Sequence, residues 1–142
     1  MLMDTNGHTF LSEDYVSYEV AKLLKEKGFN ERSAASYDPK GQLQEGRAYW
    51  NKTPIWYAAP THQMAMKWLR EVYHIEMYIT FGFPFIDDKQ QYKYFWSIVK
   101  VCDNHLEYPM DDPGSASYNE EMADSYEEAV EATLKYSLEN LI

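Results

Sequence analysis

The sequence predicts an α+β fold with two layers, in which a small, mainly antiparallel sheet packs against helices. Three stretches carry the apolar period of an amphipathic helix, and residues 75–81 alternate as a half-buried strand does. The two longest strand candidates are consecutive and are joined by a loop of about ten residues, which favours antiparallel pairing. A chain of 142 residues with 45% hydrophobic residues is expected to form one globular domain, residues 1–142.

The first predicted helix spans residues 12–27 and follows a segment, residues 1–10, that is expected to fray. Ser12 is a typical N-cap residue, and Leu11 and Val16 have the spacing of a hydrophobic staple across the start of the helix. Gly28 suits the C′ position, because glycine adopts a positive φ there without steric cost.

The elements that follow are short. Residues 37–41 (YDPKG) have the preferences of a type I turn and predict a hairpin, whereas residues 44–49 show no clear period. The aromatic run at residues 55–57 predicts a strand. That strand should end before Pro60, because proline has no N–H to donate to a neighbouring strand.

The central helix is predicted over residues 61–74, with Thr61 as its N-cap and Trp68 as its largest buried side chain. Arg70 and Glu71 lie away from the apolar stripe, so they are expected to face solvent or to be paired. Strands are predicted at residues 75–81 and 92–101, with a loop over residues 82–91 between them. The stripe itself consists of Met64, Ala65, Trp68, Leu69 and Val72.

The last predicted helix spans residues 125–141, where Ser125 and Glu128 have the spacing of a capping box. Before it, residues 103–124 are expected to form an acidic loop, since this segment contains Pro109, Pro113 and a Gly-Ser pair.

The net charge of −10 belongs to one segment of the chain. Between Val101 and Leu134 there are ten acidic residues and no lysine or arginine, while the rest of the chain holds 13 acids and 13 bases. Proteins that bind nucleic acid directly carry a basic surface, so this distribution argues against direct nucleic-acid binding.

Composition also disfavours two other classes of protein. No apolar run approaches the ~20 residues of a membrane-spanning helix, and the first residues lack the basic start and apolar core of a signal peptide. Cys102 is the single cysteine, so an internal disulfide is excluded and a reducing, cytoplasmic location is expected.

Several segments carry a resemblance to a known family. They are residues 18–29 (YEVAKLLKEKGF), Ala59-Pro60-Thr61 followed by residues 64–71 (MAMKWLRE), and residues 126–132 and 136–142 (YEEAVEA and YSLENLI). In these segments the chain resembles a family of small uncharacterised proteins from Bacteroides-type gut bacteria, their phages and their prophages. No biochemical activity is established for that family. The resemblance implies a phage or mobile-element setting, and it implies no site residues.

Cysteine and histidine are the residues from which a catalytic site could be built. Cys102 and His105 lie three residues apart at the end of a predicted strand, and a cysteine nucleophile would need a base beside it. An enzyme would require His62 and His74 to converge with this pair. The single cysteine and the four histidines, which include His8, match no zinc spacing. The sequence therefore assigns no catalytic residue, no metal ligand and no cofactor.

Two other patterns have ordinary structural interpretations. Residues 111–115 (DDPGS) lack the alternating ligands of a calcium loop, which favours a solvated turn. An aromatic group near residue 50 could stack on sugars or bases, but aromatic residues at this density are more typical of a core. That group consists of Tyr49, Trp50, Trp56 and Tyr57.

The sequence favours a non-enzymatic accessory protein that acts through protein–protein contacts. Like charges in a loop repel one another and have no helix dipole to stabilise them, so their clustering suggests a face that steers a basic protein partner. The alternatives are a small enzyme that uses histidine and cysteine, and an acidic DNA mimic that inhibits a nucleic-acid enzyme; a homodimer is also left open. The residues assigned to the acidic face are Asp111, Asp112, Glu120 and Glu121.

Overall fold

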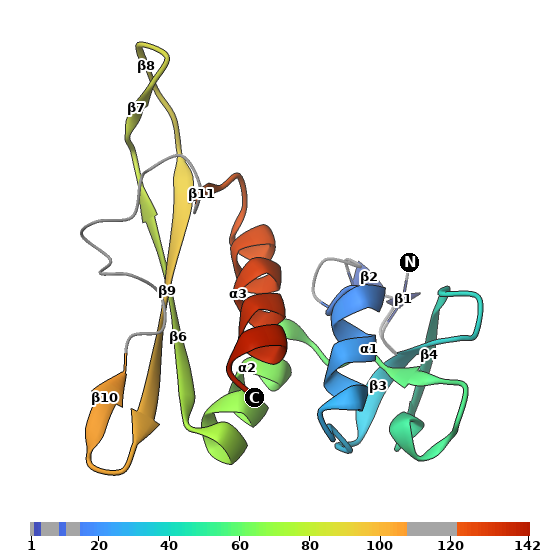
Figure 1. The fold of residues 1–142 in the computed structure, drawn as a ribbon. Coiled ribbons are helices and arrows are strands. Elements are labelled where there is room, and N and C mark those ends of the chain that lie inside the picture. Colours follow the sequence, from blue (N-terminus) through green and yellow to red (C-terminus); the bar gives the residue numbers. More distant parts are fainter. Residues whose placement is uncertain (1, 4–8, 11–14, 108–121) are drawn as a thin grey trace. The chain divides into compact units, whose positions relative to one another are not determined.

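The fold is α+β, as the sequence predicts, with helices that alternate with antiparallel strands (Figure 1). The computed structural model describes residues 2–3, 9–10, 15–107 and 122–142. Where the sequence predicts one globular domain, the structure distinguishes two compact units. The first unit comprises residues 1–65 and residue 142, and the second comprises residues 66–141.

The first unit contains helix α1 (Tyr18–Glu26), which begins later than predicted. Its N-cap is Ser17, whose hydroxyl oxygen accepts a hydrogen bond of 3.2 Å from the backbone N–H of Val20, so the assignment of Ser12 as N-cap is wrong. The residues before the helix pair with another segment: Tyr15 forms an antiparallel bridge with Thr61, and the N–H of Val16 donates to the carbonyl of Pro60 at 3.0 Å. Gly28 follows the helix with a φ of +95°, as predicted for the C′ position.

Helix α1 packs beside a three-stranded antiparallel sheet with the order β4-β3-β5. The sheet is formed by β3 (Ser33–Tyr37), β4 (Leu43–Ala48) and β5 (Tyr57–Ala58). The predicted turn between β3 and β4 is confirmed, since the N–H of Gly41 donates to the carbonyl of Asp38 at 2.9 Å. Within the segment that was expected to fray, β1 (Leu2–Met3) pairs with β2 (Thr9–Phe10).

The sequence pattern fails at β4 and β5 for two local reasons. In β4, Gly46 has a φ of +141° beside a register shift in the pairing with β3, and this irregularity breaks the period-two pattern. The strand predicted at residues 55–57 occurs instead at Tyr57–Ala58, after the 3₁₀ helix η2 (Trp50–Lys52). The carbonyls of Thr53 and Trp56 accept hydrogen bonds from Nζ of Lys25, at 2.6 and 2.8 Å, in place of a strand partner.

Helix α2 (His62–Tyr73) begins in the first unit and continues in the second. The hydroxyl oxygen of Thr61 accepts a hydrogen bond of 3.3 Å from the N–H of Met64, as expected of its N-cap. Trp68 is 7% exposed, which confirms that it belongs to the core. Val72 is 51% exposed, so its place in the buried stripe was wrong; it lies in the last turn, just before the chain leaves the helix at His74 with a φ of 57°.

The polar flank of α2 behaves as expected. A guanidinium nitrogen of Arg70 lies 3.3 Å from a carboxylate oxygen of Glu76, and Nζ of Lys67 lies 3.8 Å from a carboxylate oxygen of Glu71. Both pairs are exposed, so each is expected to stabilise the fold only weakly.

The second unit is organised around the antiparallel pair β6 (Ile75–Gly82) and β9 (Lys93–Cys102). Their register runs from Ile75 opposite Lys100 to Gly82 opposite Lys93. On its other edge β9 pairs with β10 (His105–Glu107) and β11 (Met122–Ala123), so part of the segment expected to be an acidic loop is strand. Residues 108–121 of that segment lie outside the described residues.

The loop predicted at residues 82–91 is a continuation of the same hairpin. Strands β7 (Phe85–Ile86) and β8 (Lys89–Gln90) pair in the register set by β6 and β9, and the N–H of Gln91 donates to the carbonyl of Pro84 at 3.0 Å. The hairpin closes through Asp87 and Asp88, which have φ angles of 51° and 61°. Two positive φ angles are characteristic of a type I′ turn, whose usual sequence signal is Asn-Gly or Asp-Gly.

Helix α3 (Tyr126–Asn140) covers one face of β6 and β9 in the second unit (Figure 1). Its N-cap is Ser125, whose hydroxyl accepts a hydrogen bond of 3.1 Å from the N–H of Glu128, as predicted. The carboxylate of Glu128 accepts in turn from the N–H of Asp124, also at 3.1 Å. The buried residues of the helix are Ala129, Val130, Thr133, Leu134, Ser137 and Leu138.

None of the helices in the described ranges combines the length and the apolar composition that crossing a membrane requires.

Candidate functional site

The face of the hairpin that lies beneath α3 can be followed residue by residue, because side chains alternate along a strand. Ile75 and Met77 on β6 share this face with Ile98 on β9, and all three are buried. Nζ of Lys100, on the same face, donates to the carbonyl of Leu141 at 2.9 Å. The alternation therefore identifies the odd-numbered residues of β6 as the side that α3 covers.

The same alternation continues past Tyr94, at the level where α3 begins. There the ring of Tyr94 meets the ring of Tyr126 edge-on, with centroids 6.3 Å apart. From this level, where Phe81 lies opposite Tyr94, toward the tip of the hairpin, the aromatic side chains are exposed: 68% for Phe81, 45% for Phe83, 73% for Phe85 and 67% for Tyr92. We call these four residues the aromatic ribbon.

Three residues of the aromatic ribbon take part in ring contacts. The rings of Phe83 and Tyr92 stack with centroids 4.4 Å apart, and the ring of Phe81 lies 6.5 Å from that of Tyr94. Since Tyr94 also contacts Tyr126, the rings form a series from the hairpin to the first turn of α3. Aromatic pairs at these separations add about 0.5–1.5 kcal/mol beyond their buried area.

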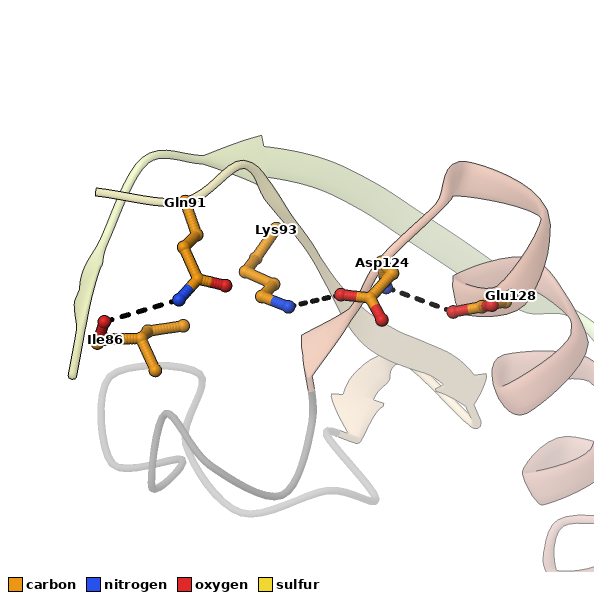
Figure 2. A network of polar contacts seen from close by, with 5 residues as sticks. All are labelled: Ile86, Gln91, Lys93, Asp124 and Glu128. Atoms are coloured by element: carbon orange, nitrogen blue, oxygen red, sulfur yellow. Dashed lines mark hydrogen bonds and ion pairs between the residues drawn. The ribbon is translucent and has the colours of Figure 1, made fainter. Parts of the chain in front are cut away.

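Side-chain hydrogen bonds connect the two strands of the hairpin that carries the ribbon. The amide of Gln91 donates to the carbonyl of Ile86 at 3.3 Å (Figure 2), and that of Gln90 donates to the carbonyl of Phe83 at 3.4 Å. These bonds join residues on opposite strands, so they restrict twisting of the hairpin where its aromatic side chains are exposed. A surface that is ordered before binding loses less conformational entropy when a partner docks.

A second set of contacts joins the hairpin to α3. The ammonium group of Lys93 forms an ion pair with the carboxylate of Asp124, and the backbone of Asp124 is bonded to Glu128 (Figure 2). Lys93 lies on β9 directly opposite Gly82, at the base of the exposed part of the hairpin. The base of the ribbon is thereby fixed to the helix that covers the rest of the same face.

The residues that the sequence assigned to an acidic partner-binding face are Asp111, Asp112, Glu120 and Glu121. All four lie outside the described residues.

The histidine and cysteine candidates are brought together in part. Cys102 and His105 face each other across the turn between β9 and β10, and Nε2 of His105 lies 3.1 Å from a carboxylate oxygen of Glu107. His74 lies at the same end of the sheet, where its carbonyl accepts a hydrogen bond of 3.0 Å from the N–H of Val101. His62 belongs to the first unit and is buried.

The electrostatics of this group oppose activation of the thiol. Partial burial raises the pKa of Cys102, and a hydrogen bond to the Glu107 carboxylate raises it further. The hydrogen bond from His105 lowers the pKa of Glu107, so the carboxylate remains charged. A nucleophilic cysteine requires a lowered pKa, which neighbouring cations supply and neighbouring carboxylates do not.

In the described ranges, no group of three or more His, Cys, Asp or Glu side chains is placed to hold a metal ion.

The aromatic group near residue 50 has a structural role. Trp50 and Trp56 stack on each other with centroids 5.3 Å apart, and the indole N–H of Trp50 donates to the carbonyl of Gly46 at 2.9 Å.

The aromatic ribbon was missed by the sequence analysis, although a signal exists. Residues 81–85 read FGFPF, so aromatic residues recur at every second position on both sides of a glycine and a proline. That period is typical of a strand with one apolar face. Proline and glycine at the intervening positions led to the interpretation as a loop.

Comparison of the chain with known protein families, curated proteins and solved structures finds no match in any of the three.

Proposed function

We propose that this protein is a non-enzymatic accessory protein that binds another protein through the aromatic ribbon. The observation that carries the proposal is the exposure of four aromatic side chains on an ordered hairpin. Large contiguous apolar surfaces on folded proteins are most often interaction sites. Aromatic residues are also over-represented among the residues that contribute most of the binding free energy at protein interfaces.

The chemistry around the ribbon supports a protein partner over nucleic acid. Exposed aromatic rings can stack on bases, but proteins that bind single strands combine such rings with a basic groove. The ribbon ends at two aspartates, Asp87 and Asp88, and the first turn of α3, which contacts Tyr94 through Tyr126, carries Glu127 and Glu128. These carboxylates would repel phosphate groups.

The proposed biological context and cellular compartment rest on the sequence. The resemblance to phage and prophage proteins supports a role in a mobile genetic element, and a single cysteine supports a reducing compartment such as the cytoplasm. In this proposal Asp111, Asp112, Glu120 and Glu121 add long-range steering of a basic partner, while the ribbon supplies the contact. Steering of this kind changes mainly the association rate and weakens with salt.

The test compares two double variants that remove exposed apolar surface from different places. Phe81→Ala/Phe85→Ala removes half of the ribbon, and Tyr49→Ala/Ile55→Ala removes side chains that are 48% and 56% exposed in the first unit. Each variant and the wild type are used to capture proteins from an extract of the organism that carries the gene. A captured protein is then purified, and its Kd for each form is measured.

The ribbon variant should weaken the Kd by tenfold or more, since truncating a central aromatic residue typically costs about 2 kcal/mol or more. The control variant should bind as the wild type does. Equal affinity of all three forms would contradict the proposal, provided that their denaturation midpoints agree.

A further inference from the structure

The charges that frame the aromatic ribbon are mainly negative. At the tip, Asp87 and Asp88 are both exposed beside Lys89. At the base, the first turn of α3 carries Glu127 and Glu128, and Asp124 precedes it. The tip and the start of α3 together carry five carboxylates and the hairpin carries two ammonium groups, those of Lys89 and Lys93; Lys93 is already paired with Asp124, and Glu128 accepts from the backbone of Asp124.

Lysine side chains of this chain lie over the rings of three tyrosines that are at least partly exposed. In the first unit, Nζ of Lys22 lies 4.6 Å from the ring centroid of Tyr18, and Nζ of Lys52 lies 4.6 Å from that of Tyr49. Nζ of Lys25 lies 4.9 Å from the centroid of Tyr57. Among the described residues no cation lies over a ring of the aromatic ribbon.

Exposed ring faces with carboxylates at both ends are complementary to guanidinium and ammonium groups. A cation over an aromatic ring gains roughly 0.5–1 kcal/mol at an exposed site, and arginine is the most frequent partner because its planar group stacks on the ring. The carboxylates at the tip and base can then accept hydrogen bonds from the same cationic side chains.

We propose, building on the function proposed above, that the aromatic ribbon binds a cationic segment of its protein partner. Arginine or lysine side chains of that segment lie on the rings of Phe81, Phe85 and Tyr92. They reach the carboxylates of Asp87 and Asp88 at one end and of Glu127 at the other. Apolar side chains of the segment fill the spaces between the rings.

The length of the ribbon sets the length of the segment. Six residue steps separate Phe81 from Asp87, and a strand rises about 3.3 Å per residue, so the ribbon extends for roughly 20 Å. An extended peptide of about six residues or a helix of about 13 residues would span that distance. A random library of dodecapeptides is therefore long enough to sample either form.

The first experiment selects such a library, displayed on phage, against the full-length protein. Peptides that also bind Phe81→Ala/Phe85→Ala are removed by counter-selection. The expected result is enrichment of peptides that combine two or more arginine or lysine residues with apolar residues. Enrichment of neutral or acidic peptides by the same procedure would overturn the cationic inference while leaving the ribbon as a binding surface.

The second experiment titrates one enriched peptide against variants of the turn residues. Asp87→Asn/Asp88→Asn removes both tip charges, and asparagine tolerates the positive φ angles of the turn. The matched control is Asp103→Asn, in the two-residue turn between β9 and β10, where Asp103 has a φ of 25°. The tip variant should weaken the Kd by about three- to tenfold at low salt and by less at high salt, and the control should not. An unchanged Kd would overturn the inference.

Other occupants are distinguished by parallel measurements on the wild type and Phe85→Ala. Binding of a thymidine oligonucleotide or of phosphatidylglycerol vesicles that depends on Phe85 would replace the cationic segment with an anionic ligand. Sedimentation as a dimer that Phe85→Ala converts to a monomer would identify a second copy as the occupant. If no peptide is enriched, or enriched peptides bind the ribbon variant equally well, the proposed function fails together with this inference.

Discussion

A β-carbon placed on Gly82 would lie 2.8 Å from Cε2 of Phe95, so the ring of Phe95 occupies the space that any other residue at position 82 would need. The contact lies on the face of the β6–β9 pair opposite α3, because Gly82 is directly opposite Lys93 and two positions from Phe95. The glycine therefore allows the ring to cross over the neighbouring strand at the base of the aromatic ribbon.

Gly82→Ala should destabilise the protein by about 1–3 kcal/mol, because the new methyl group displaces a packed ring. The measurement is the free energy of unfolding in urea. In a protein that already carries Phe95→Leu, Gly82→Ala should lower the free energy of unfolding much less, because the phenyl ring is no longer there to be displaced. Equal costs in both backgrounds would show that the two residues are not coupled.

Trp68→Ala should lower the free energy of unfolding by about 3–5 kcal/mol, because the indole is 7% exposed and its removal leaves a cavity. Its ring also meets that of Tyr73 edge-on, with centroids 5.2 Å apart. Val72→Ala, on the same helix, is the control and should cost about 0.5 kcal/mol or less, since Val72 is largely exposed. Similar denaturation midpoints for the two variants would contradict the assignment of Trp68 to the core.

Asp38 should make the stability of the protein depend on pH. Its pKa lies below the ordinary value of 3.8, chiefly because the backbone N–H of Gln42 donates to the carboxylate at 2.9 Å. The folded state therefore gains stability from the charged carboxylate above pH 3.8, and loses it as the pH falls through the lowered pKa.

In Asp38→Asn this contribution is absent at every pH. The variant should be less stable than the wild type near neutral pH, and the difference in the free energy of unfolding should shrink on acidification. Asp88→Asn, at the hairpin tip, serves as the control. A difference between Asp38→Asn and wild type that stays constant down to strongly acidic pH would count against the hydrogen-bonded carboxylate.

Cys102 should react slowly with iodoacetamide, with a midpoint of its pH–rate profile above the ordinary thiol value of 9.0. Glu107→Gln removes a carboxylate that holds the thiol proton, so the midpoint should move to lower pH and alkylation at a fixed mildly basic pH should become faster. Asp88→Asn should leave the profile unchanged. A wild-type midpoint below 9.0 would revive the enzyme hypothesis for this group of residues.

Long periodic segments of this fold were predictable from the sequence, and elements defined by tertiary contacts were not. The helix over α2 and the strands β6 and β9 have enough residues for their apolar period to be clear. For α1, both Ser12 and Ser17 are acceptable N-caps in the sequence. The hydrogen bond between Val16 and Pro60, distant in the chain, is what places the start of the helix after Ser17.

The candidate site was missed because alternation predicts burial but does not reveal where the covering element ends. Phe81 continues the alternating apolar series of Ile75, Met77 and Ile79, so the sequence places it in the core, yet it is 68% exposed. Phe81 lies directly opposite Tyr94, whose ring contacts Tyr126 in the first turn of α3, so Phe81 is level with the start of the covering helix and not beneath its later turns. The point at which a helix begins over a sheet depends on its connection, here residues 103–125, whose path the apolar period does not specify.

The order of β6, β9 and α3 along the chain has a consequence for synthesis on the ribosome. The hairpin is translated before the helix that covers it, with residues 103–125 between them. Domains fold as the chain emerges, so a nascent chain that has released β9 exposes Met77 and Ile98 together with the aromatic side chains beyond them. During that interval the apolar side chains of this face, from Ile75 to Phe85, are not yet covered by α3, and exposed apolar surface of this kind is what chaperones bind. Completion of α3 then protects one part of this face and leaves the other exposed in the finished protein.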